Sequence, residues 1–532
     1  MSRQEKRKTY GMLALGAALT ALTLIFPQVG ALEWLTLIPV AVALCLLCDR
    51  GVGLWRAYRY GFFTVFVYYF VIYHWFVYLY PLDFVGMGNA ASLAVIIAGW
   101  LGLTLLQAIP GGLIFLCFAA LTRSGWCRRY PLCKPFLLAA LWTVFEWSST
   151  LVWTGVPWGR LCLGQINLLP VLQSASLFGS YFVSFLLVAV NALLAMALLY
   201  APHRLLASLL AVALFASNLL FGVIRLGFPR KDRGSDTVAA VIQGNINSHD
   251  KWGADSYRKT VEIYGGLTRT AAADGAKLIV WPETALPYDL SNRSSVREWL
   301  EELSRECDAT LIIGALWTDD AGEEYNSLFL VTPDGGFSMT QRYDKRHLVP
   351  FGEYVPMRKL IMTLIPPLAE LSALDDDLTP GSDSALFETE WGKIGALICF
   401  DSIYEMLSVD SVRDGAGLML ISSNDSWFYD SAAVRQHQYQ AQLRAIETGR
   451  TYLRAANTGI SSVILPSGKT SALIDPLTEG YAVRAVSFRS DRTLYTCIGN
   501  LFVGLCTVFC LAFPTWEIGC VIRRRRSAAP RE

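Results

Sequence analysis

The sequence is short of charge for its length. Only 17% of its 532 residues are charged, whereas 53% are hydrophobic; an ordinary globular chain is roughly 25% charged and 45–50% apolar. One buried core cannot explain this deficit, so the composition excludes a disordered chain, a fibrous protein and a purely soluble enzyme. The formal net charge of +1 provides no overall field that would attract nucleic acid, and no nucleic-acid partner is expected.

Groups that hold metals or nucleotides are also scarce. The five histidines are widely spaced and include no H-E-x-x-H, and no G-x-G-x-x-G or P-loop occurs in the charged part of the chain, so neither a metal nor a cofactor is expected. Of the 12 cysteines, only Cys307 and Cys399 lie between residues 228 and 491. Most others sit in apolar runs, which argues against a disulfide framework. Cys45 and Cys48 have redox spacing, but they end an apolar segment and are interpreted as structural.

The charges that are present occur in blocks. Apolar runs fill the first part of the chain, a charged and mixed segment follows, and a last apolar run ends before four arginines at 523–526. The predicted parts are a membrane bundle over residues 1–227, an inserted polar domain over 228–492, a final transmembrane helix over 493–521 and a basic tail over 522–532.

About eight apolar runs approach the roughly 20 residues that a membrane-crossing helix needs. The predicted spans are residues 10–26, 31–48, 61–80, 89–121, 135–155, 173–199, 204–226 and 493–520. The fourth run is too long for one straight helix, and Pro110-Gly111-Gly112 in its middle indicates either one kinked helix or two half-helices.

The distribution of lysine and arginine predicts the orientation of these spans. If the fourth run crosses once, the basic N-terminal tail, the basic loops after the second, fourth and sixth spans, and the C-terminal arginines all fall on one side. Positive residues concentrate in cytoplasmic loops, so both termini are expected in the cytoplasm and the polar domain on the opposite face. The N-terminal run resembles a signal peptide, but without a convincing A-x-A site we interpret it as a retained anchor.

Within the polar domain, short apolar runs alternate with helical patterns. Strands are expected at 237–243, 277–281, 310–314, 326–332, 337–343, 393–399, 417–422 and 460–466, and helices at 254–274, 294–306 and 432–450. Strands that are apolar throughout and alternate with helices predict an α/β layered domain. In such domains, reactive side chains collect just past the carboxyl ends of strands.

Three segments place reactive side chains at predicted strand ends. Glu283 follows an apolar strand, where burial would raise the pKa of a carboxyl and suit it to be a general base; the alternative is the cap of a turn. Lys345 and Glu353 share a loop at 343–356 that two prolines and a glycine fix; the alternative is a solvated charge run. Cys399 is a nucleophile if a base and a cation lie nearby, and otherwise an inert buried thiol.

Together these segments resemble the nitrilase superfamily, and with the membrane spans the whole chain resembles the bacterial apolipoprotein N-acyltransferase family. The motifs that carry the resemblance are W-P-E at 281–283, D-K-x-H-L-V-P-F-G-E-x-x-P at 344–356 and N-D-S-W-F at 424–428. The resemblance implies a polytopic α-helical bundle with an inserted nitrilase-like α-β-β-α sandwich. It also implies that the protein lies in the bacterial inner membrane with its catalytic domain in the periplasm.

The resemblance further implies roles for individual residues. Glu283 is the expected general base, Lys345 the cation that stabilises the tetrahedral oxyanion, and Cys399 the acyl-accepting nucleophile. Glu353 matches an additional carboxylate that the family needs, and Trp252 matches a tryptophan near the substrate.

Two further positions, candidates for the oxyanion or substrate site, depart from the family pattern. The family has tyrosine and then glutamate after the nucleophile, whereas this chain has Phe400 and then Asp401. The negative charge is kept on a shorter side chain, but the phenolic hydroxyl is lost. Only the backbone N–H of Phe400 is therefore carried over to the oxyanion site.

The expected reaction is transfer of a fatty acyl chain through a Cys399 thioester. The resemblance supplies a phosphatidylethanolamine-like phospholipid as donor and, as acceptor, the α-amino group of the diacylglyceryl-modified N-terminal cysteine of an apolipoprotein. The apolar stretch 357–374 is predicted to be a mobile lid or arm at the membrane surface, or else a core helix broken by two prolines. Glu146 and His74 are ionisable groups in the spans and are therefore functional candidates. The alternatives are that either pairs with a neighbouring helix, or that Glu146 lies near the membrane surface.

Two other functions remain open from the residues alone. A membrane-anchored amidase or nitrilase would use the same Glu-Lys-Cys site with water as the final acceptor, although it would need neither the bundle nor the lid. A transporter or scaffold with an extracytoplasmic binding domain would not depend on the Cys399 thiol.

Overall fold

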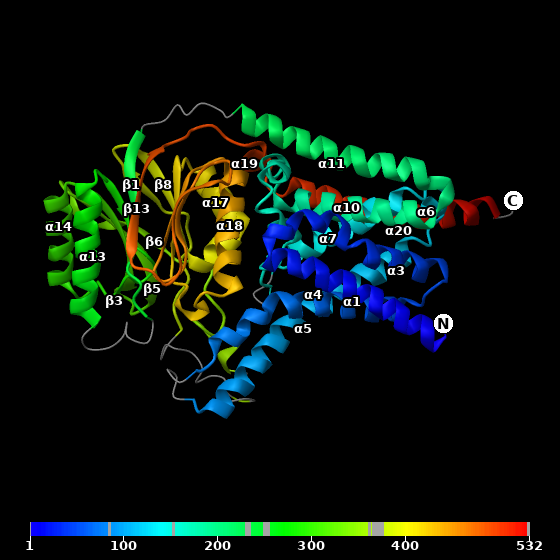
Figure 1. The fold of residues 1–532 in the computed structure, drawn as a ribbon, viewed down its shortest axis with the longest axis horizontal. Coiled ribbons are helices and arrows are strands. Elements are labelled where there is room, and N and C mark those ends of the chain that lie inside the picture. Colours follow the sequence, from blue (N-terminus) through cyan, green and yellow to red (C-terminus); the bar gives the residue numbers. More distant parts are fainter. Residues whose placement is uncertain are drawn as a thin grey trace. The chain divides into compact units, whose positions relative to one another are not determined.

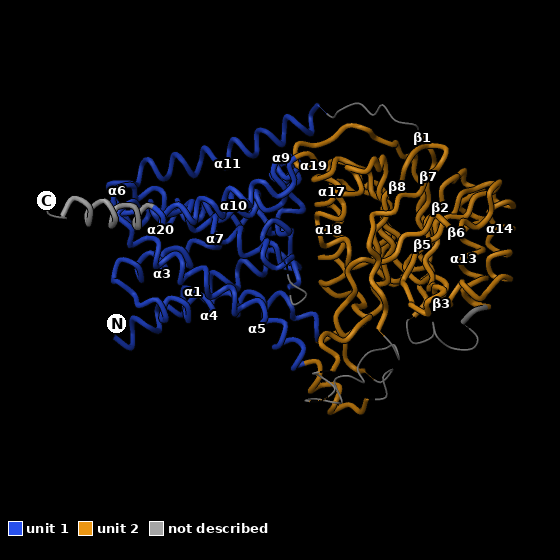
Figure 2. The backbone as a smooth tube through the Cα atoms, turned by 180° about the vertical axis from the view of Figure 1, so that it is seen from behind, with its two compact units in different colours: residues 1–76, 97–229, 498–532 blue, residues 77–96, 230–497 orange. Residues whose placement is uncertain are grey.

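The computed structural model describes residues 2–82, 87–151, 155–228, 236–247, 256–359, 363 and 377–528. The chain divides into two compact units, which Figure 2 shows in blue and orange. The first consists of residues 1–76, 97–229 and 498–532, and the second of residues 77–96 and 230–497.

The first unit is built of helices in its described part, as the high apolar content of its sequence predicts. Its elements are α1 (Arg3–Ile25), η1 (Pro27–Leu32), α2 (Glu33–Thr36), α3 (Ile38–Asp49), α4 (Leu54–Ile72), η2 (Tyr73–Leu79, which continues into the second unit), α5 (Asn89–Leu121, which begins there), α6 (Gly125–Arg129), α7 (Cys133–Ser148), η4 (Leu161–Gln165), α8 (Leu169–Leu172), α9 (Ala175–Phe178), α10 (Ser180–Leu199), η5 (Ala201–His203), α11 (Arg204–Gly227) and α20 (Leu501–Ala528).

Six helical segments among the described residues are long and apolar enough to cross a membrane. They are Arg3–Ile25, Pro27–Asp49, Leu54–Leu79, Asn89–Leu121, Ser180–Leu199 and Ala201–Gly227. The predicted spans at 135–155 and 493–520 fall on α7, which has 16 residues, and on α20, whose described apolar part Leu501–Phe513 is also short. The polytopic helical bundle is thus confirmed, with six full-length apolar segments where about eight were expected.

The fourth predicted span is one helix, α5, with Pro110 inside it. The two glycines that follow Pro110 are explained by close packing against α4. A Cβ atom at Gly111 would lie 2.6 Å from the Val65 side chain, and one at Gly112 would lie 2.6 Å from the Tyr58 ring. The sequence Pro-Gly-Gly therefore marks a helix contact and not a break between two half-helices.

The second unit contains the strands, which Figure 1 shows together with their helices. The elements are β1 (Asp236–Gln243), α13 (Ser256–Ala273), β2 (Leu278–Val280), β3 (Leu286–Asp289), α14 (Ser294–Cys307), β4 (Thr310–Thr318), β5 (Glu324–Thr332), β6 (Gly336–Asp344), β7 (Leu386–Thr389), β8 (Gly392–Ile398), η6 (Cys399–Ile403), α17 (Glu405–Arg413), β9 (Leu418–Ser423), η7 (Ser426–Phe428), α18 (Ala432–Thr448), β10 (Tyr452–Ala456), β11 (Ser461–Ile464), β12 (Thr470–Ile474), β13 (Gly480–Ser487) and α19 (Leu494–Ile498).

These strands form two sheets. The first has the order β13-β1-β2-β4-β5-β6, with β3 beside β4, and the second has the order β12-β11-β10-β9-β8-β7. The neighbours β1-β2-β4 and β8-β9-β10 are parallel, so the carboxyl ends of β2 and of β8 face the same way as those of their partners. Sequence patterns indicated the α/β layering, while the division into two sheets came only from the resemblance.

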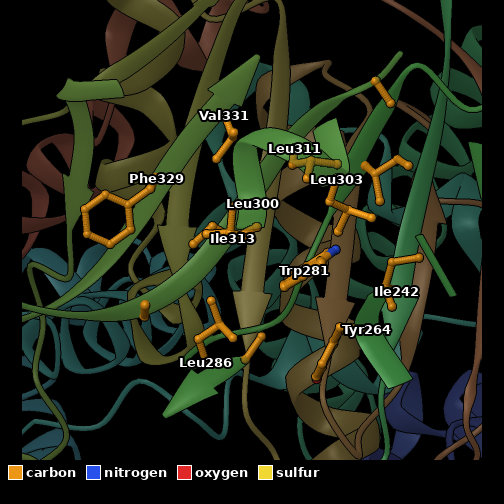
Figure 3. Close-up of a cluster of buried hydrophobic side chains, with 14 of the residues drawn as sticks. Ile242, Tyr264, Trp281, Leu286, Leu300, Leu303, Leu311, Ile313, Phe329 and Val331 are labelled. Carbon is orange, nitrogen blue, oxygen red and sulfur yellow. The ribbon is translucent and has the colours of Figure 1, made fainter. Parts of the chain in front are cut away.

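Alternating residues of each strand build two different cores, as strand geometry requires. Ala239 and Val241 of β1 pack with Ile394 and Leu420 of the second sheet. Their neighbours Ala240 and Ile242 face the other way, toward the helices α13 and α14. Figure 3 shows this helix-side cluster, in which Trp281, Tyr264, Leu300 and Leu303 are buried. The helices α17 and α18 lie against the second sheet, which completes the α-β-β-α sandwich.

Candidate active site

Glu283 lies just past the end of β2, and Trp281, two residues before it, fixes this segment in place. Trp281 is completely buried, and its indole N–H donates a 3.0 Å hydrogen bond to Thr268. The Ser422 hydroxyl of the second sheet donates a 2.8 Å hydrogen bond to the carbonyl oxygen of Trp281. The base candidate is therefore fixed to both sheets, and only 5% of it is exposed.

Lys345 lies between two carboxylates. It follows β6, its side chain is 1% exposed, and its Nζ lies 2.8 Å from Oε1 of Glu283 and 2.9 Å from Oε1 of Glu353. Burial by itself would lower the pKa of Lys345, but the two carboxylates outweigh burial and raise that pKa well above its ordinary value. Lys345 therefore remains a cation at any physiological pH.

Two asparagines complete the coordination of these carboxylates. The Asn326 amide Nδ2 donates to Oε1 of Glu283 at 2.8 Å and to Oε1 of Glu353 at 2.9 Å. The backbone N–H of Asn424 donates to Oε2 of Glu283 at 2.8 Å. These bonds leave Glu283 little freedom to rotate, which favours a single orientation of the base.

Cys399 begins the short helix η6 directly after β8. Its φ of 49° lies in the left-handed region, which a non-glycine residue adopts only when its surroundings hold it there. Burial raises the pKa of the Cys399 thiol, the charges of Glu283 and Asp425 raise it further, and Lys345 opposes them. The resting thiol is consequently neutral, and attack needs a base that removes its proton.

Asp401, two residues after Cys399, is fully buried. Its carboxylate accepts hydrogen bonds from the Tyr343 hydroxyl at 2.8 Å, from the backbone N–H of His347 at 2.7 Å and from that of Ile398 at 3.1 Å. Burial raises the pKa of Asp401 to about 6, although Lys345 and these bonds oppose the shift. The Asp401 side chain thereby joins η6 to the segment that carries Lys345. The neighbouring Phe400 ring is half-buried and packs edge-on against Tyr404, with ring centroids 5.5 Å apart.

A second charged cluster lies on the other side of Cys399. The side chains of Cys399, Asp425 and His437 place one potential metal-ligand atom each within 4.8 Å of one another. However, Asp425 lies 2.7 Å from the Arg454 guanidinium and 2.9 Å from Nδ1 of His437. Burial would raise the pKa of Asp425, but Arg454 and His437 outweigh burial and lower it. Because the Arg454 guanidinium already binds the Asp425 carboxylate, this cluster is a hydrogen-bonded network and a poor fit for a metal ion.

Some predicted residues fall elsewhere. Trp252 and nearly all of the predicted lid at 357–374 lie outside the described residues. Glu146 is buried in the helical unit, where it accepts hydrogen bonds from the Trp142 indole at 3.0 Å and from the backbone N–H of Leu161 at 2.9 Å. The His74 ring lies 3.0 Å from the Val71 carbonyl oxygen. Trp142 lies on the same helix as Glu146, and Val71 is three residues before His74, whereas Leu161 belongs to the separate segment η4.

Sequence patterns identified the candidate site residues at strand ends but missed the buried polar residues that hydrogen-bond around them. Asn326, Asp425, His437 and Arg454 were not singled out, although all four are at least 97% buried. Asn326 lies near the start of a strand with no motif around it, and His437 is a polar residue on a helix. Only the N-D-S-W-F motif, which contains Asp425, pointed to this region.

The four-layered sandwich with a glutamate, a lysine and a cysteine converging from three strand ends defines a carbon-nitrogen hydrolase domain. Residues 238–493 match the carbon-nitrogen hydrolase family, and residues 17–193 match the apolipoprotein N-acyltransferase N-terminal domain. The match to the helical part comes first in the chain and the match to the hydrolase domain second. Because curated apolipoprotein N-acyltransferases match it at 32% identity over 94–96% of its length, the chain belongs to the apolipoprotein N-acyltransferase family.

Curated relatives support this assignment over nearly the full length. The chain is 32% identical over 510 residues to the apolipoprotein N-acyltransferase of Geobacter metallireducens, covering 94% of this chain and 93% of that protein. It is 32% identical over 510 residues to that of Gloeobacter violaceus, covering 96% and 94%. Among solved structures, Saccharomyces cerevisiae Nit3, a nitrilase-superfamily member, is similar with 20% identity and a TM-score of 0.37, covering 47% of this chain and 90% of that one.

Proposed function

We propose that this acyltransferase moves a fatty acyl chain from a phospholipid to the α-amino group of a diacylglyceryl-modified N-terminal cysteine, through a thioester on Cys399. The observation that carries the proposal is the approach of a carboxylate and an ammonium to a thiol at the ends of three strands. A covalent intermediate divides the transfer into two steps, so donor and acceptor need not be bound together.

In the first half-reaction, Glu283 takes the proton of the Cys399 thiol and the sulfur attacks the ester carbonyl carbon of the phospholipid. The negative charge that develops on the carbonyl oxygen is stabilised by the Lys345 ammonium and by the backbone N–H of Phe400. The carbon–oxygen ester bond then breaks, and protonated Glu283 returns its proton to the leaving alkoxide. The products are a lysophospholipid and the thioester.

In the second half-reaction, the neutral amine of the acceptor attacks the thioester carbonyl carbon. Glu283 takes a proton from the attacking nitrogen, the same donors stabilise the oxyanion, and the carbon–sulfur bond breaks. Glu283 then returns the proton to the Cys399 sulfur. The products are an amide and the resting thiol, so protons and electrons balance over the cycle.

The other site residues support these steps. Glu353 and Asn326 hold Lys345 and Glu283 in place, because they bind the same atoms that the reaction uses. Asp401 acts by joining the Cys399 segment to the Lys345 segment, since its own carboxylate is fully buried. Trp252 is proposed to contact substrate on the basis of the resemblance alone.

The substrates and their location follow the same proposal. The family name implies lipid and lipoprotein substrates, and the six long apolar segments indicate a multi-pass membrane protein. The finer proposal is a phosphatidylethanolamine-like donor, an inner-membrane location, cytoplasmic termini, and a catalytic domain over residues 228–492 in the periplasm. This arrangement places the thiol on the side of the membrane opposite to the basic loops, which are expected to be cytoplasmic.

The reaction is tested by mass spectrometry of the purified protein. Incubation with phosphatidylethanolamine should add one acyl mass to the peptide that contains Cys399, and a diacylated lipopeptide with a free amine should remove it as an amide. The Cys399→Ala variant is the control and should gain no adduct. Release of the acyl group as free acid alone would favour the hydrolase, and no adduct on phospholipid-bound protein would contradict the thioester mechanism.

The orientation is tested with a membrane-impermeant maleimide. A cysteine introduced at exposed Asp320 in the second unit should react in intact spheroplasts above the wild-type background. A cysteine introduced at exposed Arg128 in a basic loop should react only after the membrane is permeabilised. The reverse pattern would contradict the proposed topology without affecting the chemistry.

A further inference from the structure

The peptide group that joins Cys399 to Phe400 is held from its carbonyl side. The Ser402 hydroxyl donates a 2.7 Å hydrogen bond to the Cys399 carbonyl oxygen, and Nε2 of His437 lies 3.1 Å from the same oxygen. Because a trans peptide group is planar, its N–H points away from its C=O. These two contacts therefore set the direction of the Phe400 N–H, which is the proposed oxyanion donor.

Nε2 is the nitrogen of His437 that faces the Cys399 carbonyl. The other nitrogen, Nδ1, lies 2.9 Å from Oδ1 of Asp425, which only accepts when ionised, and 3.1 Å from Nη2 of Arg454, which only donates. A carbonyl oxygen also only accepts, so a bond to Cys399 requires a proton on Nε2. The Ser402 oxygen, 2.9 Å from Nε2, can accept from the ring while its own hydrogen points to the same carbonyl. The surroundings of Nε2 thus fit a ring nitrogen that donates.

This cluster is built into the interior. His437 is 1% exposed, and Ser402, Asp425 and Arg454 are 0% exposed. The four side chains come from α18, η6, the segment after β9, and β10. Ser402 and His437 contact the carbonyl oxygen, and Asp425 and Arg454 hold the far side of the His437 ring. Burying polar and charged groups is costly unless they are paired, and here each is paired with another member of the cluster. The cluster also lies beside Cys399, whose left-handed φ needs such support.

We propose that His437 is a positioning residue for the oxyanion site, which it reaches through the Cys399 carbonyl. A donor at a carbonyl oxygen polarises the peptide group, so the N–H on the opposite side becomes a stronger donor. His437 touches no substrate in this role. It acts on the tetrahedral intermediates of both half-reactions, because both place their oxyanion at the Phe400 N–H. The inference rests on the proposed thioester mechanism and adds a residue to it.

The matched variants are His437→Asn and His437→Gln. The glutamine amide reaches the place of Nε2 and keeps an N–H for the Cys399 carbonyl, whereas the shorter asparagine amide reaches only the place of Nδ1. Single-turnover acylation by phosphatidylethanolamine and discharge by a diacylated lipopeptide should both slow about tenfold in His437→Asn. His437→Gln should recover most of the rate. The phospholipid concentration that gives half-maximal acylation should stay unchanged in both.

Alkylation of Cys399 by iodoacetamide provides the readout that separates positioning from general damage. Alkylation displaces iodide at a saturated carbon and forms no oxyanion. Because a nitrogen of the His437 ring lies within 4.8 Å of the Cys399 sulfur, the rates are compared between the two variants, which both lack the ring, and these two rates should be equal. Peptide mass spectrometry isolates the reaction of Cys399 from that of the other cysteines. Ser402→Ala, which removes the second donor, should slow acylation about threefold and leave alkylation unchanged; it tests the inference even if His437→Asn does not fold.

The outcomes are distinct. Acylation that slows in His437→Asn and recovers in His437→Gln, with equal alkylation rates in the two variants, supports the inference. Equal acylation rates in all proteins, or a parallel loss of acylation and alkylation, would overturn it. A wild-type protein that forms no adduct would instead refute the thioester mechanism, and this inference with it.

Discussion

The Nζ of Lys345 lies 2.8 Å from Oε1 of Glu283, and the same ammonium binds Glu353, so two carboxyl groups share one buried cation. In the proposed mechanism, Glu283 loses its negative charge when it takes the thiol proton, just as the oxyanion forms beside it. The proposed base would thus remove a proton and also a negative charge that would repel the oxyanion.

Replacing Lys345 with methionine should destabilise the fold as well as abolish acylation. The substitution leaves two buried carboxylates without their cation, and breaking a buried ion pair in this way costs about 3 kcal/mol. Denaturant unfolding in detergent measures the cost. The double variant with Glu353→Gln should recover part of the lost stability but no acylation, because the charge imbalance is reduced while the oxyanion partner is still missing. Equal stability of the single and double variants would contradict this account.

Two substitutions of Asn326 should distinguish the effect of charge on stability from the effect of packing at the same site. Asn326→Asp places a third carboxylate against Glu283 and Glu353, where the wild type has an amide donor. Like charges at this distance raise one another's pKa, so Asn326→Asp should be less stable than Asn326→Ala at pH 8 and closer to it at pH 5. The unfolding temperatures of the two variants are measured at both pH values. If the two variants differ by the same amount at pH 5 as at pH 8, the negative charge of the introduced aspartate is not the cause of the lower stability.

The sequence patterns predicted the strands that carry the reactive residues. The strands before Glu283 and Cys399 are short apolar runs that end at abrupt changes in polarity, whereas the strand before Lys345 is mostly polar and only partly buried. The strands that precede Glu283, Lys345 and Cys399 were expected at 277–281, 337–343 and 393–399 and are found at Leu278–Val280, Gly336–Asp344 and Gly392–Ile398. The weaker strands β3, β7, β10, β12 and β13 were missed. Two of them, β12 and β13, are only partly buried, so their apolar pattern is diluted.

Residues that act through long-range contacts could not be predicted in this way. Asn326 and Glu283 are 43 positions apart, and His437 and Cys399 are 38 apart. Nothing local distinguishes a buried asparagine that binds a catalytic carboxylate from one that caps a turn. Similarly, the two sheets pack through alternate residues of β1, and a strand that is apolar on both faces does not reveal which face meets a sheet and which meets a helix.

Gly314 should tolerate no side chain, because β4 passes close to the segment that carries Glu283. A Cβ atom there would lie 2.3 Å from the Pro282 carbonyl oxygen and 3.0 Å from Cα of Glu283. Gly314→Ala should cost about 3 kcal/mol of stability and displace the base. The control is Gly266→Ala in helix α13, where a Cβ meets nothing within 4 Å and should stabilise by about 0.5–1 kcal/mol. Similar effects of the two substitutions would contradict the packing argument.

Asp401 and His347 should give the stability two opposite pH dependences. The pKa of Asp401 is raised by burial to about 6 from an ordinary 3.8, so the folded state binds more protons than the unfolded state between these values. Its contribution to stability is present below about pH 4 and is lost as the pH rises to about 6. The pKa of His347 is lowered by burial and by Arg346 to about 4 from an ordinary 6.5. Its contribution is present above about pH 6.5 and is lost as the pH falls to about 4.

Removing either Asp401 or His347 should leave the pH dependence of stability that the other residue contributes. Asp401→Asn leaves His347, so its unfolding temperature should rise relative to that of the wild type as the pH increases from 4 to 6. His347→Gln keeps the backbone N–H that binds Asp401 and removes only the ring, so its unfolding temperature should fall relative to the wild type over the same range. Each curve is read as a difference from the wild type at pH 4, 5, 6 and 7, which cancels the titration of the other carboxylates. Because the two slopes have opposite signs, differences that run in the same direction would show that the burial of these two groups does not control the pH dependence of this segment.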